Sequence, residues 1–114
     1  MKITRLEQCP AQGVDMEGVQ GASKQVPLGV SDGVPNFSIR VFTLEPGGHT
    51  PHHAHDAEHL NYVLDGQGEV MGDQGPRPIT EGDYVFIAPH ERHQYRNTGP
   101  VPLRFLCMVP KEYE

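Results

Sequence analysis

The stretch GGHTPHHAHDAEHLNYVLDG, residues 47–66, carries the strongest local signals in this chain. It opens on a pair of glycines and then places five of the seven histidines within positions 49–59. The segment 59–64 is rich in β-forming residues, and the turn Asp65-Gly66 ends it. The stretch therefore combines a β-strand with a dense cluster of imidazole side chains, which are the commonest metal ligands in proteins.

Further predicted strands lie on both sides of this stretch at a spacing of roughly ten residues, as in an all-β sandwich or barrel. They cover 24–28, 37–44, 59–64, 68–71, 83–87, 93–97 and 102–109. Pro27 limits the first of them to a sheet edge, because proline has no N–H to donate to a neighbouring strand. The strands 59–64 and 68–71 are predicted to pair as a hairpin. No helix longer than a turn or two is predicted, so the expected fold class is all-β.

The composition indicates one small domain with a small-molecule partner. The 114 residues include 13 glycines and 11 prolines, which favour short strands and tight turns. A net charge of −6 argues against nucleic acid or an anionic membrane as a partner, and no apolar run is long enough to cross a membrane. The first residues lack the apolar segment of a secretion signal, and two cysteines are too few for a disulfide framework. We therefore expect a cytoplasmic protein.

Four of the histidines are spaced so that their rings can converge. His53 and His55 are two positions apart, so both rings project from one side of an extended segment. His59 begins the next strand and shares a face with Asn61. His93 begins a later strand, and neutral imidazoles from neighbouring strands can meet at one divalent ion.

The remaining histidines, His49, His52 and His90, fit solvent-exposed polar residues better than metal ligands. A histidine-rich run can also be a solvated loop that binds metal only loosely. We prefer an ordered site for His53, His55 and His59. His53 and His55 share one side of an extended segment, and His59 has a defined face at the start of the next strand.

The spacing of glycines and histidines resembles the first motif of the cupin superfamily, G-x5-H-x-H-x3,4-E-x6-G. Gly47 is followed by five residues, His53-Ala54-His55, three residues, His59 and six residues to Gly66. The position that is usually glutamate holds His59 here, and Glu58 stands one place earlier. This all-histidine set is similar to that of small single-domain cupins that bind manganese and other divalent metals through four histidines.

A later group of residues resembles the second cupin motif, G-x5-P-x-G-x2-H-x3-N. Gly82, Pro89, His93 and Asn97 occupy this motif in order. Pro89 lies one residue late and the second glycine of the motif is replaced, but the spacing from Gly82 to His93 is unchanged. Two motifs in the correct order make the resemblance specific.

The resemblance implies a double-stranded β-helix, the jelly-roll barrel of the cupins. It implies a single cupin domain over 1–114, with an amino-terminal arm and edge strand over 1–35 and the barrel over 36–110. The implied cofactor is one divalent transition metal, with manganese or iron preferred to nickel, copper or zinc. The implied ligands are His53, His55, His59 and His93.

Residues beside these ligands are candidates for the wall of a substrate pocket. Alternate positions after His59 and His93 continue the two ligand faces. The family layout adds residues from the strands 37–44 and 102–109 at the mouth of the barrel. The candidates are Arg40, Phe42, Asn61, Tyr95, Phe105 and Cys107, with Met71 and Phe86 as weaker ones. For Phe86, packing in the core is the simpler explanation.

Four neutral imidazoles leave a divalent ion with its full charge, whereas a glutamate ligand would cancel half of it. Such a centre suits a small metal-dependent oxidoreductase of the dioxygenase type, acting on a small organic substrate, and this is the enzyme we expect. One alternative is a metal-dependent isomerase or lyase, in which the ion acts only as a Lewis acid. The other is a non-catalytic cupin that binds a small molecule.

Several predicted strands are apolar on both faces, so their outer face is expected to be covered. In 59–64, for example, Leu60, Tyr62 and Leu64 occupy the face opposite Asn61. The amino-terminal arm is one explanation, and a homodimer that buries this face is the other. We expect the homodimer, because a short chain with a modest core gains from the added burial.

Replacing His59 by glutamate tests the effect of the all-histidine ligand set. We expect His59→Glu to keep the metal, because glutamate is the usual residue at this position in cupins and its oxygen suits manganese and iron. The added negative charge is expected to lower the reduction potential of the metal and to weaken azide binding. Metal content, potential and azide affinity are measured on both proteins, and equal azide affinity at an equal potential would contradict this interpretation.

Overall fold

The computed structural model describes residues 1–114 and confirms the all-β fold class. Its strands are β1 (Gln12–Gly13), β2 (Gln20–Leu28), β3 (Phe37–His49), β4 (His59–Asp65), β5 (Gln67–Gly72), β6 (Gly75–Thr80), β7 (Tyr84–Ile87), β8 (Gln94–Arg96) and β9 (Leu103–Pro110). The helices are three short 3-10 turns, η1 (Leu6–Gln8), η2 (Val30–Asp32) and η3 (Lys111–Tyr113). None of them has the length and apolar character needed to cross a membrane.

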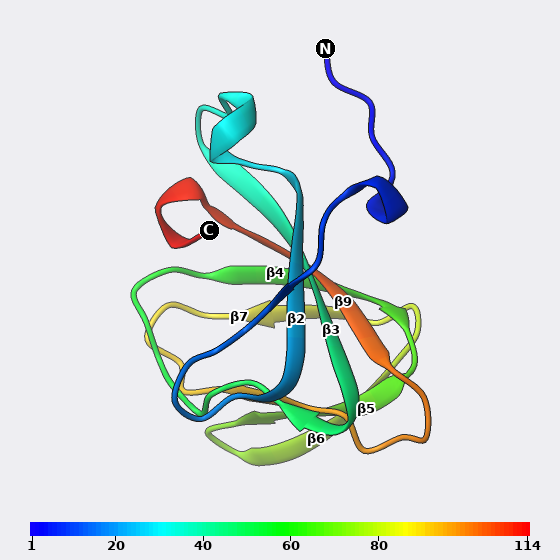
Figure 1. Cartoon of the computed structure of the whole chain (residues 1–114). Helices are drawn as coiled ribbons and strands as arrows, with labels where there is room; N and C mark the ends of the chain where they lie inside the picture. The colour runs from blue at the N-terminus through cyan, green and yellow to red at the C-terminus, as the bar shows by residue number, and fades with distance from the viewer.

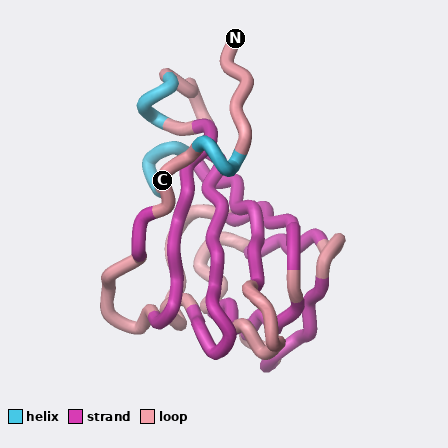
Figure 2. Tube along the Cα trace, turned by 45° about the vertical axis from the view of Figure 1, so that its right-hand side comes forward, coloured by secondary structure: helices cyan, strands magenta, loops and turns pink.

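The strands form one strongly curled sheet in the order β6-β5-β8-β3-β9-β4-β7, with β2 added to β3 and β1 added to β2. The long strand β3 joins the two halves of this sheet. It pairs with β9 from Phe37 to Leu44, and its last residue, His49, reaches Arg96 of β8. The sheet wraps around one interior as a jelly roll, with both chain ends at the same end of the barrel (Figures 1 and 2).

The predicted hairpin between 59–64 and 68–71 is wrong. β4 pairs with β7 and β9, whereas β5 pairs with β6 and β8. Gly66, with a φ of 84°, turns the chain from one half of the barrel to the other instead of folding it back on β4. An Asp-Gly turn suits either a hairpin or a corner of a jelly roll, and only the packing of the two halves distinguishes them.

The strand β6 was not predicted from the sequence. Its sequence, GPRPIT, contains two prolines, which argue against a central strand. In the structure β6 is the last strand of the sheet and pairs only with β5, so it needs hydrogen-bond donors on one side alone.

Side chains alternate between the interior and the outside of the barrel, and His59 and Asn61 share the inner face, as the spacing along 59–64 predicted for a common face. In β4, His59, Asn61 and Val63 are buried, and in β9 the alternate residues from Leu103 to Val109 are buried. The hydrophobic core consists of Leu44, Val63, Val70, Ile79, Ile87, Tyr95, Leu103 and Phe105. The strands therefore supply both the apolar core and a set of buried polar residues.

The amino-terminal arm lies along β2 and η2. Gln25 Nε2 donates hydrogen bonds of 2.9 Å to the carbonyl oxygens of Leu6 and Cys9. Lys2 Nζ lies 2.7 Å from a carboxylate oxygen of Asp32 in η2. The arm does not cover β7, whose outer aromatic side chains are exposed.

Candidate metal centre

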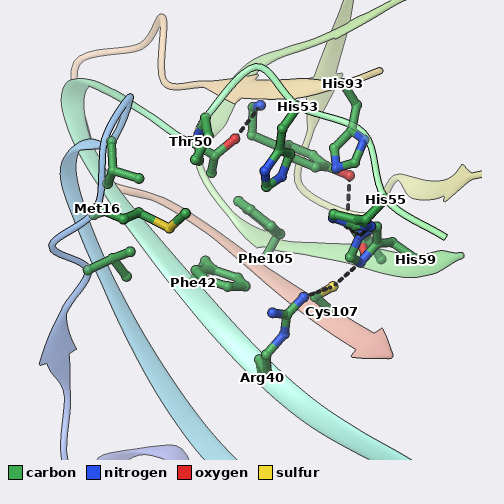
Figure 3. A pocket seen from close by; sticks show the side chains of 16 residues that line it. Met16, Arg40, Phe42, Thr50, His53, His55, His59, His93, Phe105 and Cys107 are labelled. Atoms are coloured by element: carbon green, nitrogen blue, oxygen red, sulfur yellow. Dashed lines mark hydrogen bonds between the residues drawn. The ribbon is translucent and has the colours of Figure 1, made fainter. Parts of the chain in front are cut away.

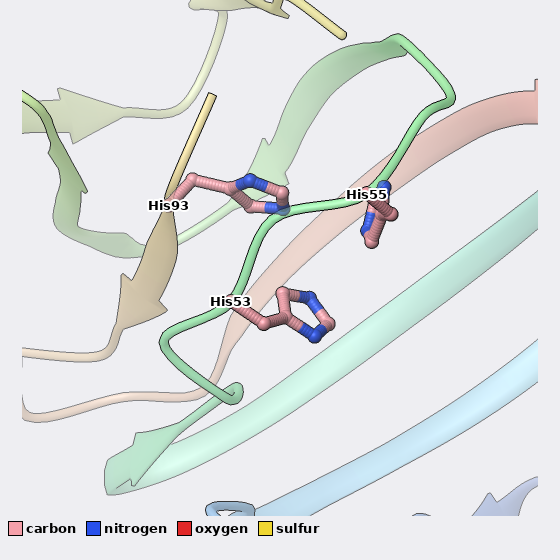
Figure 4. Close-up of side chains that lie close together, drawn as sticks. All are labelled: His53, His55 and His93. Carbon is pink, nitrogen blue, oxygen red and sulfur yellow. The ribbon is translucent and has the colours of Figure 1, made fainter. Parts of the chain in front are cut away.

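A two-bond bridge between His53 and His93 joins the loop before β4 to the start of β8. His53 N donates to the His93 carbonyl oxygen at 3.1 Å, and His93 N donates to the His53 carbonyl oxygen at 2.9 Å. Further along the loop, His90 N donates to the His55 carbonyl oxygen at 2.7 Å. These bonds fix both backbone segments, and the rings of His53, His55 and His93 gather in one group (Figure 4).

His59 adds a fourth ring from the first position of β4 (Figure 3). Its ring centroid lies 4.3 Å from that of His55 and 5.1 Å from that of His93. The ring of His53 lies 4.8 Å from His55 and 5.2 Å from His93. Four imidazoles thus converge from the loop, from β4 and from the start of β8.

Hydrogen bonds to two of the rings direct their second nitrogen into the cluster. His93 Nδ1 lies 2.8 Å from the Glu91 carbonyl oxygen, so Nδ1–H donates and Nε2 is left free. His59 Nδ1 lies 3.3 Å from Cys107 Sγ, and His59 Nε2 lies 2.9 Å from His55 Nε2. Arg40 Nη2 donates to the same sulfur at 3.1 Å. The thiol of Cys107 therefore links the pocket arginine to a histidine of the cluster.

Burial and repulsion from nearby positive charges favour the neutral form of His53, His59 and His93. Burial, followed by repulsion from His55 and Arg40, lowers the pKa of His59 to about 3. Burial, followed by repulsion from His55 and His93, lowers the pKa of His53 to about 4. Burial also lowers the pKa of His93. A neutral imidazole has the lone pair that a metal ion requires, so burial and ligation favour the same protonation state.

The donor atoms fit a divalent transition metal. One ring nitrogen from each of His53, His55 and His93 lies within 4.8 Å of the others. The distance of 2.9 Å between Nε2 of His55 and Nε2 of His59 is close to the ~3.0 Å between neighbouring nitrogens bound at about 2.1 Å to one octahedral ion. Glu58 is exposed, so the usual cupin carboxylate has no counterpart here. The three-histidine cluster supports a metal site, and the ligand role of His59 stays a prediction.

The other three histidines lie outside the cluster. His52 is exposed, and the ring of His49 contacts the Thr50 carbonyl oxygen at 3.2 Å. His90 is exposed and has a φ of 68°, which is unusual for a residue other than glycine. It contributes to the site through its backbone bond to His55, and its ring faces Asp56 at 3.7 Å.

The six main pocket candidates, Arg40, Phe42, Asn61, Tyr95, Phe105 and Cys107, all line a cavity of about 120 Å³ beside the four histidines. Tyr95 stacks on Phe105 with ring centroids 4.2 Å apart, and Phe105 stacks on Phe42 at 5.6 Å. The guanidinium carbon of Arg40 lies 4.9 Å from the centre of the Phe42 ring. One wall of the cavity is therefore a row of aromatic faces, and Figure 3 shows Phe42 and Phe105 within it.

The two weaker candidates, Met71 and Phe86, do not line this cavity. Phe86 is 60% exposed on the outer face of β7, so the core packing considered for it is also wrong. The reason is the register of β7, in which Val85 and Ile87 lie opposite Asn61 and His59 and face inward. Alternation along the strand then turns Phe86 outward.

Sequence analysis missed the part of the cavity wall that precedes β3. Val14, Met16 and Val19, between β1 and β2, line the cavity together with Ala22 of β2. Val14 N donates to the Ala22 carbonyl oxygen at 2.9 Å, which closes the loop, and Val19 N donates to the Met16 carbonyl oxygen at 3.2 Å within it. Its spaced apolar residues were the only signal, and they do not show which part of the barrel the turn approaches.

A jelly-roll barrel with a histidine cluster inside it defines the cupin class of proteins. The chain belongs to the cupin family, since residues 40–109 match Cupin_2, the cupin domain. The resemblance found in the sequence is confirmed at this level. The turn with Val14, Met16 and Val19 lies outside the matched residues.

Comparison with known proteins gives relatives of different functions. The chain is 34% identical over 74 residues to the 1-methylthio-D-xylulose 5-phosphate methylsulfurylase of Rhodospirillum rubrum, covering 65% of this chain but only 47% of that protein. It is 32% identical over 114 residues to the oxalate-binding protein of Thermotoga maritima, covering 96% of this chain and 93% of that protein. Among solved structures, the polyketide cyclase RemF from Streptomyces resistomycificus is similar with a TM-score of 0.92 and 29% identity, covering 96% of this chain and 79% of that one.

Replacing any one of the four clustered histidines by alanine is expected to weaken binding of a divalent metal by at least about tenfold, because a ligand is lost from a buried site. Affinity is measured by competition with a chelator. The matched controls are His52→Ala and His90→Ala, which are expected to bind like the wild type. Unchanged affinity in the His59→Ala protein would remove His59 from the ligand set.

The pKa values of His53 and His59 predict that the metal-free protein loses stability in acid. In the unfolded chain the pKa of each group is about 6.5, well above its pKa in the folded protein. As the pH falls, the unfolded state therefore binds protons before the folded state does. The free energy of unfolding is therefore expected to be highest above that pH and to fall as the pH drops from 7.5 to about 5.5. Urea unfolding with EDTA present measures it.

Two variants test the source of this pH dependence. His59→Gln is expected to reduce the slope of stability against pH, because the buried imidazole is absent from both states. His52→Gln, at an exposed position, is expected to leave the slope unchanged. An equal slope in all three proteins would show that other groups cause the acid sensitivity.

Proposed function

We propose that this chain forms the active site of a metal-dependent enzyme that acts on a small, largely apolar substrate. The observation that carries the proposal is the convergence of four imidazoles, two buried and two half-buried, on a cavity with a row of aromatic rings in its wall. The reaction we favour is an isomerisation, elimination or cyclisation at a carbonyl or enol group. A structural role for the cluster does not account for its position in the wall of a cavity.

His53, His55, His59 and His93 are the residues that would hold the ion. When bound, the ion would supply a Lewis acid that polarises an oxygen of the substrate. Manganese and iron are the preferred metals, and nickel, copper and zinc also accept imidazole ligands.

The charge of the cavity supports a substrate that carries a polar or anionic oxygen. No aspartate or glutamate lines the cavity, so nothing in its wall cancels the charge of Arg40. Arg40 is held by Nη1, which donates to the Tyr113 carbonyl oxygen at 3.1 Å, and by its contact with Cys107. Its buried Nε–H has no hydrogen-bond partner in the protein.

Similarity to the polyketide cyclase RemF supports carbonyl chemistry without an external oxidant. The dioxygenase-type oxidoreductase expected from the sequence is the second candidate. The all-imidazole donor set favours it, because such sites also retain redox-active iron, manganese and copper. Similarity to an oxalate-binding protein supports the third alternative, a non-catalytic cupin.

Acetophenone, a single aromatic ring with one ketone, distinguishes these functions. For a Lewis-acid enzyme we expect the zinc- and manganese-loaded proteins to catalyse exchange of its methyl protons for deuterium without dioxygen, as measured by NMR. For an oxidoreductase, oxygen uptake is expected with manganese or iron and not with zinc. The metal-free protein and a His93→Ala variant are the controls. Exchange and oxygen uptake no faster than in these controls would contradict both enzymatic functions.

We also propose that the protein acts as a homodimer in the cytoplasm. Free thiols at Cys9 and Cys107 support a reducing compartment. The outer face of the terminal strand β7 supports the dimer, because Tyr84 and Phe86 are 83% and 60% exposed. Apolar residues continue this face across β4 and β9, where Leu60 lies between Phe86 and Met108. A two-fold axis would bury the same face on both copies.

Replacing Phe86 by lysine is expected to convert the dimer to a monomer, because a charged side chain would then enter an apolar interface. Size-exclusion chromatography with light scattering measures the mass. Val101→Lys is the matched control, since Val101 is 51% exposed and belongs to a loop away from β7. A wild-type protein that is monomeric at high concentration would contradict the proposal.

A further inference from the structure

Two buried side chains in the cavity wall have hydrogen-bonding capacity that the protein does not use. Asn61 and Tyr95 are 5% and 3% exposed. Asn61 Nδ2 donates to the Tyr95 hydroxyl oxygen, but Asn61 Oδ1 has no partner. Leaving a buried amide oxygen unpaired is costly, and native proteins rarely do so without a ligand or a water molecule at the position.

The Tyr95 hydroxyl also has a proton to donate. A phenol hydroxyl carries one O–H donor besides its acceptor lone pairs. Its oxygen accepts a hydrogen bond from Asn61, which is its single hydrogen-bonding partner in the protein. The pair therefore leaves one donor and one acceptor without a protein partner in two neighbouring residues that line the cavity.

We propose that Asn61 and Tyr95 form a recognition site for the hydroxyl group of a single-ring aromatic ligand. A ligand hydroxyl can accept the Tyr95 proton and donate its own proton to Asn61 Oδ1, which closes a ring of three hydrogen bonds. If the amide of Asn61 is turned round, the same ring closes in the opposite direction. A ketone or an ether can only accept and an ammonium group can only donate, so neither completes the ring in the observed orientation.

The surroundings of this pair select an aromatic ligand. The ring of Tyr95 is stacked on Phe105 with an interplanar angle of 20°, and Phe105 is stacked on Phe42 with an angle of 28°. Met16 adds apolar surface from the turn before β2 (Figure 3). The cavity of about 120 Å³ is somewhat smaller than an apolar cavity of about 150 Å³ that binds benzene, so its enclosed part limits the ligand to one ring.

The pair is close in sequence to two of the candidate ligands. Asn61 follows His59 by two residues on β4, and Tyr95 follows His93 by two residues. This inference rests on the cavity of the proposed function and names its substrate class, but it does not require the metal.

Two fluorinated probes of equal size test the proposal, 4-fluorophenol and 4-fluorotoluene. Their affinities for the full-length protein are measured by fluorine NMR titration, with the metal removed by EDTA and again with zinc added. We expect Tyr95→Phe to weaken 4-fluorophenol by about tenfold, because one hydrogen bond is lost, and to leave 4-fluorotoluene nearly unchanged. Leucine is close in size to asparagine, so Asn61→Leu is also expected to weaken binding of 4-fluorophenol and to leave binding of 4-fluorotoluene nearly unchanged.

Tyr62→Phe is the matched control, because Tyr62 lies on the outer side of β4 and loses the same hydroxyl. Circular dichroism establishes whether each variant is folded. If one of Asn61→Leu and Tyr95→Phe does not fold, the other still tests the proposal. An equal change for both probes, or no change for 4-fluorophenol in either folded variant, overturns the proposal and assigns a water molecule to the unpaired atoms. A selective loss of affinity for 4-fluorophenol in the metal-free variants supports the recognition site, even if the acetophenone experiment excludes catalysis.

Discussion

The two backbone hydrogen bonds between His53 and His93 connect the loop before β4 to the residue that precedes the short strand β8. Without them, two rings on a loop would be free to move relative to the rings supplied by β4 and β8. With them, the distance between the two histidine-bearing segments is set by the backbone, and the side chains need only rotate to meet. The metal centre is therefore a consequence of how the two halves of the jelly roll are joined.

Bringing four imidazoles together inside a protein carries a physical consequence for their charge. Each ring is partly removed from water and faces others that would repel it if protonated, which lowers the pKa values of His53, His59 and His93. The protein thus maintains neutral ligands at the expense of stability in acid. The cavity beside them is aromatic and has no carboxylate, so Arg40 is the cation that faces it. This combination favours an apolar ligand with a polar oxygen over a sugar or a peptide.

The site divides into a part that belongs to the cupin family and a part that is particular to this chain. The histidines and the aromatic row lie within the matched residues 40–109, and the histidines form the candidate metal centre. The turn before β2 lies outside that range and closes the cavity with apolar side chains. Relatives with the same barrel carry names as different as polyketide cyclase and oxalate-binding protein. Such differences arise where the wall varies while the barrel stays the same.

Local regularities of the sequence were sufficient to predict the all-β class, most of the strands and the grouping of the histidines. The reason is that alternation along a strand and the spacing of residues on an extended segment are properties of neighbouring residues, as in His59 and Asn61. The pairing of β5 with β6, the outward direction of Phe86 and the position of Met16 over the cavity depend instead on which segments meet in space. A turn such as Asp65-Gly66 is compatible with more than one such arrangement, and only the packing of the two halves of the barrel selects one. The contact between Asn61 and Tyr95 also depends on the tertiary structure, because these residues belong to strands that are distant in sequence. Only the folded barrel places the unpaired Asn61 Oδ1 near the hydroxyl proton of Tyr95.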